Sequence, residues 1–216
     1  MNPINAGARN TTCPQCGAPV QFQWSQAVQT TCPYCNSILV RTDVDLKKVG
    51  QVSDYPNDAS PIQIGTEGIH DNKAFVVIGR IAYEWENGGW NEWHIVYNNG
   101  ENAWLSDAQL EFAVTKQIPW SSSLDGQLAA GTMVEVNGKL YTASTITMAN
   151  YRAVEGELPF EFWDKTVCQF VDLRGYEGDF LTIDYTEQPP LLFSGRFVTF
   201  EELKIKNYRI FDGWQP

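Results

Sequence analysis

Four cysteines near the N-terminus form two Cys-x-x-Cys pairs that are separated by 15 residues: Cys13, Cys16, Cys32 and Cys35. Two residues between two thiols let one tight turn direct both sulfurs at the same ion, and the distance between the pairs is typical of a four-thiolate zinc site. Gly17 and Asn36, which follow the pairs, are residue types that accept the left-handed backbone of such a turn. Because four thiolates complete a tetrahedron, the pattern predicts a structural Zn(II) with no open position for catalysis.

The residues around the two pairs favour short strands that would hold this site. Val20, Phe22 and Trp24 alternate with two glutamines, and residues 37–41 form a second run of the same kind. We therefore predict a zinc ribbon over residues 1–49. Without a basic stripe, this ribbon is not expected to bind nucleic acid.

The rest of the chain offers few residues for catalysis. His70 lies in a turn, where a solvated loop residue is expected. Glu92 and His94 are two residues apart in a predicted strand, so their side chains share the face opposite Trp93. This pair could hold a metal or relay a proton, but a solvated pair on the wet face of a sheet is the simpler interpretation. Cys168 lies among apolar residues and is predicted to be a buried, inert thiol.

A group of carboxylates further along the chain fits no calcium-loop spacing and is interpreted as a solvated acidic face: Glu155, Glu157, Glu161 and Asp164. The sequence contains no glycine-rich phosphate loop, nucleophile elbow or metal-hydrolase motif. These observations weigh against catalysis.

The composition favours a folded protein with a cationic ligand. The chain has 216 residues, of which 26 are Asp or Glu and 15 are Lys or Arg, so its formal net charge is -11. This charge argues against binding to nucleic acid or anionic lipid.

The sequence contains no apolar run close to the roughly 20 residues that span a bilayer, and no signal-peptide pattern. Because paired thiols that bind metal suit a reducing compartment, we expect a cytoplasmic protein without a membrane span.

The pattern after the cysteines is that of a mainly β protein. Residues 50–61 are rich in turn formers and are predicted to be a linker. From residue 62 to residue 216, apolar and polar residues alternate in runs such as 93–97 and 180–185, and turn signals such as Asn137-Gly138 separate these runs. We predict a barrel-like or sandwich-like β domain over residues 62–216.

This β domain contains an internal similarity that predicts two tandem halves, at about residues 62–116 and 128–210. Four residues of the first half match four of the second at an offset of 66: Gly65, Thr66, Lys73 and Phe75 match Gly131, Thr132, Lys139 and Tyr141. At an offset of 93, residues 105–112 align with residues 198–205, and both stretches carry a capping box that predicts a helical turn. The larger offset places an insertion at about residues 149–179. We expect a ligand site at the seam between the halves and a recognition element in the insertion.

Several strings resemble a bacterial family known as domain of unknown function 4178, over about residues 61–208. They are residues 75–83, 90–94, 104–105, 155–159, 172–173, 183–185 and 193–195. The resemblance implies a domain that often follows a zinc ribbon, that has no established catalytic residues, and that acts beside polyamine-related or membrane-remodelling proteins.

Two functional hypotheses follow. The first is a non-enzymatic zinc-binding adaptor or binding module, whose acidic, aromatic β domain recognises a protein partner or a polyamine-like cationic small molecule. The second is an enzyme that acts on a small cationic substrate through the Glu92 and His94 face or through the acidic insertion. The residues predicted to contact the ligand are Glu84, Trp85, Glu86, Trp90, Glu92, Trp93, His94, Trp104, Glu155 and Glu157. At least half of the tryptophans are expected to pack in the core instead.

Overall fold

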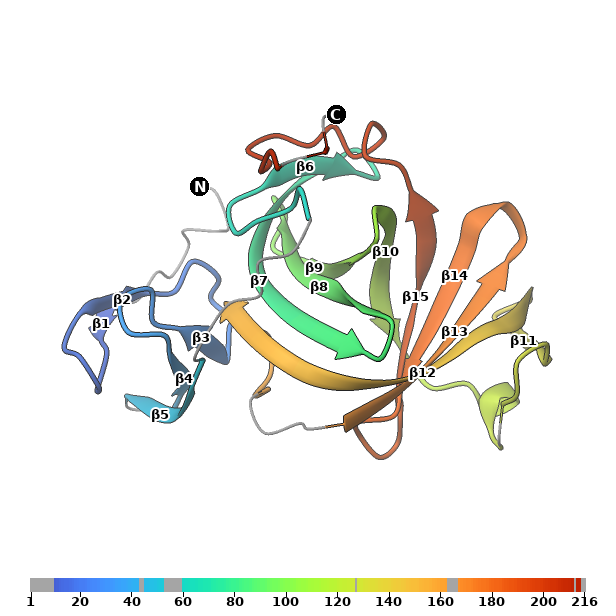
Figure 1. The fold of residues 1–216 in the computed structure, drawn as a ribbon, viewed down its shortest axis with the longest axis horizontal. Coiled ribbons are helices and arrows are strands. Elements are labelled where there is room, and N and C mark those ends of the chain that lie inside the picture. The colour runs from blue at the N-terminus through green and yellow to red at the C-terminus, as the bar shows by residue number, and fades with distance from the viewer. Residues whose placement is uncertain are drawn as a thin grey trace.

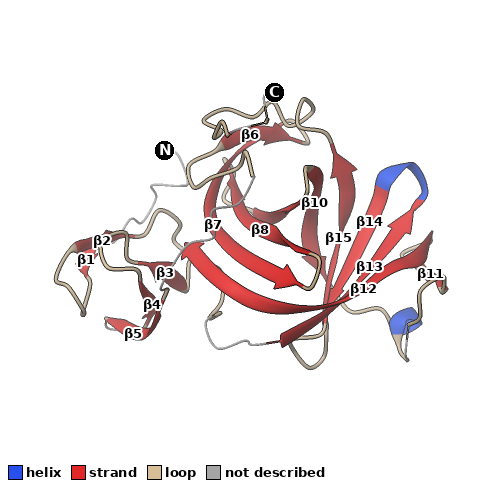
Figure 2. Ribbon diagram, in the orientation of Figure 1, coloured by secondary structure: helices blue, strands red, loops and turns tan. Residues whose placement is uncertain are grey.

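The computed structural model describes residues 10–42, 45–52, 60–126, 128–162, 167–211 and 213–214, and its regular structure is almost entirely β (Figure 2). Two small sheets form the N-terminal part (Figure 1). The first sheet contains β1 (Asn10–Thr12) and β2 (Pro19–Gln21), and the second contains β3 (Gln29–Thr31), β4 (Ser37–Arg41) and β5 (Leu46–Gln51). We call residues 10–52 the cysteine module.

The remaining strands form one ten-stranded antiparallel sheet, which confirms the predicted mainly β class. Its first five strands are β6 (Glu67–His70), β7 (Lys73–Trp85), β8 (Gly88–Tyr97), β9 (Asn102–Ala108) and β10 (Glu111–Ile118). Its last five are β11 (Met133–Val136), β12 (Lys139–Gly156), β13 (Val167–Gly175), β14 (Asp179–Asp184) and β15 (Leu191–Val198). Short 3-10 turns, η1 (Ser122–Leu124) and η2 (Tyr176–Gly178), lie between some of them.

The ten strands form two five-stranded meanders that close into a barrel. Within each meander, neighbours in sequence pair with each other. The meanders then pair twice, through β10 with β15 and through β7 with β12. These two seams complete a ring of eight strands, while β6 and β11 lie outside the ring at equivalent positions. The ring agrees with the predicted barrel-like architecture.

The starts of the two meanders have the same local structure at the predicted offset of 66 residues. The Gly65 amide donates to the Val77 carbonyl, and the Gly131 amide donates to the Ala143 carbonyl, both at 2.8 Å.

Each meander also has a separate apolar cluster on its outer face. Leu203 and Ile205 from the C-terminal segment complete the first cluster, and Leu124 of η1 completes the second. The two outer faces are therefore covered in a similar way.

The alignment at an offset of 93 was wrong. Ser106 lies inside β9 and not at a helical turn, because Ser106 pairs with Glu92 and Ala113 on either side. The second predicted capping box does form. The Thr199 amide donates to the Glu202 carboxylate at 2.7 Å, and the Glu202 amide donates to the Thr199 hydroxyl at 3.2 Å.

The segment predicted as an overhanging insertion, residues 149–179, contains strands of the ring. Residues 150–156 are the end of β12, where this strand pairs with β7, and β13 pairs with β12 and β14. Their backbone hydrogen bonds are needed to close the barrel. Trp163 and Asp164 lie outside the described residues. In the predicted linker, Gly50 and Gln51 belong to β5, and residues 53–59 lie outside the described part.

Close backbone approach at the β10–β15 seam leads to a first prediction. A methyl group on Gly195 would overlap the Val114 carbonyl of the neighbouring strand. Because this strand pair closes the ring, Gly195→Ala should lower the free energy of unfolding by about 2 to 3 kcal/mol. Chemical denaturation measures the change. Arg196→Ala removes an exposed neighbouring side chain and should change the free energy by less than about 1 kcal/mol. Equal stabilities of the two variants would contradict the prediction.

Candidate functional site

The four cysteines of the cysteine module meet in one cluster, with their sulfur atoms all within 4.8 Å of one another. The Cys13 and Cys35 sulfurs are 3.7 Å apart, and the Cys16 and Cys32 sulfurs are 3.8 Å apart. Four sulfurs at about 2.3 Å from a central ion form a tetrahedron with edges of about 3.8 Å. A disulfide would bring two sulfurs to about 2.05 Å. The cluster therefore has the donor set and the dimensions of a metal site.

The two Cys-x-x-Cys turns are built in the same way. The Gly17 amide donates to the Cys13 carbonyl at 2.8 Å, and the Asn36 amide donates to the Cys32 carbonyl at 3.0 Å. Gly17 and Asn36 have φ angles of 72° and 56°, which confirms the predicted left-handed conformation.

The surroundings of the cluster shift the pKa values of the individual thiols in different directions. Cys13 and Cys32 are buried in the apolar core of the module, among residues such as Leu39. The Ser37 hydroxyl, 3.2 Å from the Cys35 sulfur, lowers the pKa of that thiol to about 6. This lower pKa favours the thiolate form that binds metal at Cys35, whereas burial raises the pKa of Cys32.

A second candidate site lies inside the barrel, where two neighbouring cavities have volumes of about 90 and 380 Å³. Glu92, Phe170 and Thr182 line both cavities, so they stand where the two meet. All eight strands of the ring contribute to the lining. The cavities thus occupy the space between the two meanders, where the sequence predicted a ligand site.

Of the carboxylates in the cavity walls, three are buried or half-buried: Glu92 on β8, Asp172 on β13 and Asp184 on β14. Burial raises the pKa of Glu92 to about 8, and the nearby Asp172 and Asp184 add to the shift by charge repulsion. Hydrogen bonds from Ser106 Oγ at 2.7 Å and Trp90 Nε1 at 3.1 Å oppose it. Burial also raises the pKa of Asp172. Sequence reasoning missed both aspartates.

Aromatic rings stand beside these carboxylates. Tyr83 stacks on Trp90 with ring centres 4.9 Å apart, and Phe170 meets both rings edge-on at 5.0 and 5.2 Å. Trp104 stacks on Phe160 at 5.8 Å in the smaller cavity. Carboxylates combined with aromatic faces attract cations.

The predicted ligand residues of the β7–β8 hairpin occupy different environments. Trp85 is 39% exposed and lines the wall of the larger cavity. Glu84 pairs with Arg152 at 3.0 Å, and Glu86 is exposed in the turn. Trp93 is only 1% exposed and packs in the outer apolar cluster of the first meander, on the opposite face of β8 from Glu92. Trp93 is therefore a core tryptophan.

The expectation that Glu92 and His94 form a solvated pair was wrong, because Glu92 faces the cavities inside the ring and Trp24 of the cysteine module covers His94. His94 is 0% exposed, and its ring lies 5.0 Å from Trp24 and 5.2 Å from Trp104. Its Nδ1 donates to the Glu157 carbonyl at 2.9 Å, and its Nε2 accepts from the Asn102 amide at 3.2 Å. Burial lowers the pKa of His94 to about 4, so its ring is neutral at pH 7.

The two predicted ligand residues at the end of β12 differ from a solvated acidic face. Glu157 is 2% exposed, and its carboxylate accepts hydrogen bonds from the Gln23 amide at 2.6 Å and from the Trp24 amide at 3.0 Å. Glu155 lies 3.9 Å from the buried guanidinium of Arg80. Glu157 thus contacts the cysteine module of its own chain.

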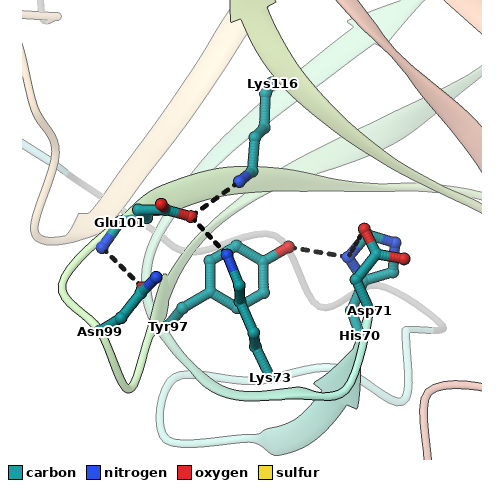
Figure 3. A network of polar contacts seen from close by, with 7 residues as sticks. All are labelled: His70, Asp71, Lys73, Tyr97, Asn99, Glu101 and Lys116. Carbon is teal, nitrogen blue, oxygen red and sulfur yellow. Dashed lines mark hydrogen bonds and ion pairs between the residues drawn. The ribbon is translucent and has the colours of Figure 1, made fainter.

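The remaining titratable candidates lie away from the cavities. Cys168 is buried, as predicted. His70 ends β6 and its Nδ1 lies 2.8 Å from the Tyr97 hydroxyl, beside an ion pair network in which Lys73 and Lys116 both contact one oxygen of Glu101 (Figure 3). Hydrogen bonds from the two lysines hold the pKa of Glu101 well below its usual range. This network ties together strands of the first meander.

Comparison with known proteins gave one match. A family model described as Domain of unknown function (DUF4178) matches residues 63–200, which contain all ten strands of the large sheet. Searches of the curated proteins and of the solved structures found no match.

Among the described residues, none of the helices has the length and apolar character needed to cross a membrane.

Proposed function

The chain belongs to the DUF4178 family, and on that premise we propose that it is a non-enzymatic binding module. Its cysteine module holds a structural Zn(II) as a zinc ribbon, and its barrel binds a cationic small molecule of the polyamine type. The observation that carries the proposal is the set of buried or half-buried carboxylates, Glu92, Asp172 and Asp184, on the walls of two neighbouring cavities that aromatic rings also line.

The chemistry of this cavity favours an ammonium ligand. Each aromatic face attracts an ammonium group by about 0.5 to 2 kcal/mol. Glu92 holds a proton at neutral pH because its pKa is about 8, and an ammonium group beside Glu92 would replace that proton. A small molecule is favoured over a protein partner because these carboxylates line cavities between the strands of the ring. We place the protein in the cytoplasm, where thiolates stay reduced.

Zinc is favoured for the cysteine cluster by its four thiolates and tetrahedral dimensions.

The enzyme hypothesis receives less support. Both ring nitrogens of His94 are engaged in buried hydrogen bonds, so this histidine is not positioned to take a proton from a ligand in the cavity.

Titration calorimetry with spermidine tests the cavity. The wild-type protein should bind spermidine with release of a proton at pH 7, because Glu92 ionises on binding. Glu92→Gln should weaken binding at least tenfold, since a neutral amide replaces the charge. Glu86→Gln removes an exposed carboxylate from the β7–β8 turn and should stay within twofold of wild type. Equal losses in the two variants would contradict the proposal, because they would indicate general charge attraction.

A further inference from the structure

One short segment connects the cysteine module to the cavity. We call residues 157–162 the bridging segment. Its last three residues, Phe160, Glu161 and Phe162, line the smaller cavity. Its first two residues, Glu157 and Leu158, make hydrogen bonds to the cysteine module. A change in the module can therefore reach the cavity wall through six residues.

A single residue of the module, Gln29 on β3, holds both ends of the Leu158–Phe162 stretch. Its backbone amide donates to the Leu158 carbonyl at 3.2 Å, and its carbonyl accepts from the Leu158 amide at 2.9 Å. Its side-chain Nε2 donates to the Phe162 carbonyl at 3.0 Å, and its Oε1 accepts from the Phe162 amide at 2.8 Å. Gln29 is 0% exposed, so these bonds are not exchanged for bonds to water.

The barrel itself holds the same segment mainly by apolar contacts. Phe160 stacks on Trp104, and Phe162 meets Tyr83 edge-on at 6.1 Å. The Glu157 amide donates to the Ile78 carbonyl at 2.7 Å at the start of the segment. Without Gln29, the phenylalanine rings would keep their apolar contacts, but the buried Phe162 backbone would lose both of its Gln29 partners.

We propose that Gln29 is a positioning residue for the barrel cavity: it sets the place of Phe160 and Phe162 in the cavity wall, and metal binding at the four cysteines keeps it in position. Gln29 lies three residues before Cys32 on the strand that leads into the second Cys-x-x-Cys turn. The order of this short strand depends on the fold of the module. The ligand part of this inference rests on the proposed function, whereas the structural part does not.

Gln29→Met tests the inference, because methionine has a similar size and no amide. Hydrogen exchange measured residue by residue should show at least tenfold faster exchange of the Phe162 amide, with the metal content unchanged. Spermidine should bind about tenfold more weakly. Gln21→Met, at an exposed position of β2, is the matched control and should leave both properties unchanged. If Gln29→Met does not fold, metal removal from the wild-type protein should produce the same change in exchange at Phe162.

The outcomes separate the two proposals. Unchanged exchange at Phe162 in Gln29→Met would overturn the positioning role. Faster exchange with unchanged spermidine affinity, while Glu92→Gln still weakens binding, would also overturn it and leave the proposed function standing. Failure of the wild-type protein to bind spermidine would overturn the proposed function alone, because the exchange measurement needs no ligand.

Discussion

Removing the metal, by a chelator or by Cys32→Ser, is expected to unfold the cysteine module and to leave the barrel folded. The strands of the module have only three to six residues. A segment of this size has too small a core to be stable alone, and a four-thiolate zinc site contributes on the order of 10 kcal/mol to folding. The two outer clusters of the barrel contain no residue of the module, so the barrel should stay folded. Its stability should fall, because Ile38 and Val52 of the module pack against barrel residues such as Tyr83.

Calorimetry and metal analysis measure this effect. The wild-type protein should contain one metal ion per chain, and Cys32→Ser should contain none and lose the unfolding transition of the module. Cys168→Ser is the matched control, because this thiol is buried in the barrel and is not part of the metal cluster. Retention of a full metal complement by Cys32→Ser would show that the cluster is not the binding site.

A second large effect is expected on the pH dependence of stability. Burial raises the pKa of Glu92 from 4.5 to about 8, so the folded protein holds a proton that the unfolded chain releases. The contribution of Glu92 to the free energy of unfolding is therefore complete below about pH 4.5 and is lost as the pH rises through 8. The slope of the free energy of unfolding against pH approaches about 1.4 kcal/mol per pH unit inside this window, so the total is on the order of 5 kcal/mol.

Glu92→Gln should remove most of this slope, because glutamine is neutral at every pH, and the variant should be more stable than wild type at pH 8. Glu157, whose pKa burial raises to about 7, should leave a smaller downward slope. Below about pH 6.5 this slope is opposed by His94, because its lowered pKa makes stability rise with pH. Denaturant unfolding between pH 5 and pH 8 measures both effects, with Glu86→Gln as the exposed control. A slope in Glu92→Gln equal to that of wild type would show that Glu92 is solvated in the folded protein.

The four-cysteine cluster and the class of fold could be predicted because they depend on local patterns. Cys-x-x-Cys spacing, Gly17 and Asn36 determine a turn within a few residues, and alternation with a period of two identifies strands wherever one face is buried. Alternation also places Phe170 with Asp172, and Thr182 with Asp184, on shared strand faces. That signal could have identified the missed aspartates as facing the same side as aromatic residues.

Which face is enclosed depends on segments far apart in the chain. The pairing of β7 with β12 turns the carboxylate face of the strands toward an internal cavity. The cysteine module covers His94 through Trp24, and it provides two backbone amides for Glu157. Local periodicity contains no information about either contact, so both residues were expected in water.

The amino-acid sequence alone determined the four-cysteine cluster, the β class and the similar hairpins at an offset of 66 residues, because each follows from interactions between residues close in the chain. Only the tertiary structure decided which carboxylates are desolvated and that residues 157–162 join the cysteine module to the cavity wall. The physical reason is that desolvation depends on which distant strands close over a side chain, and burial is what gives Glu92 and Glu157 their raised pKa values.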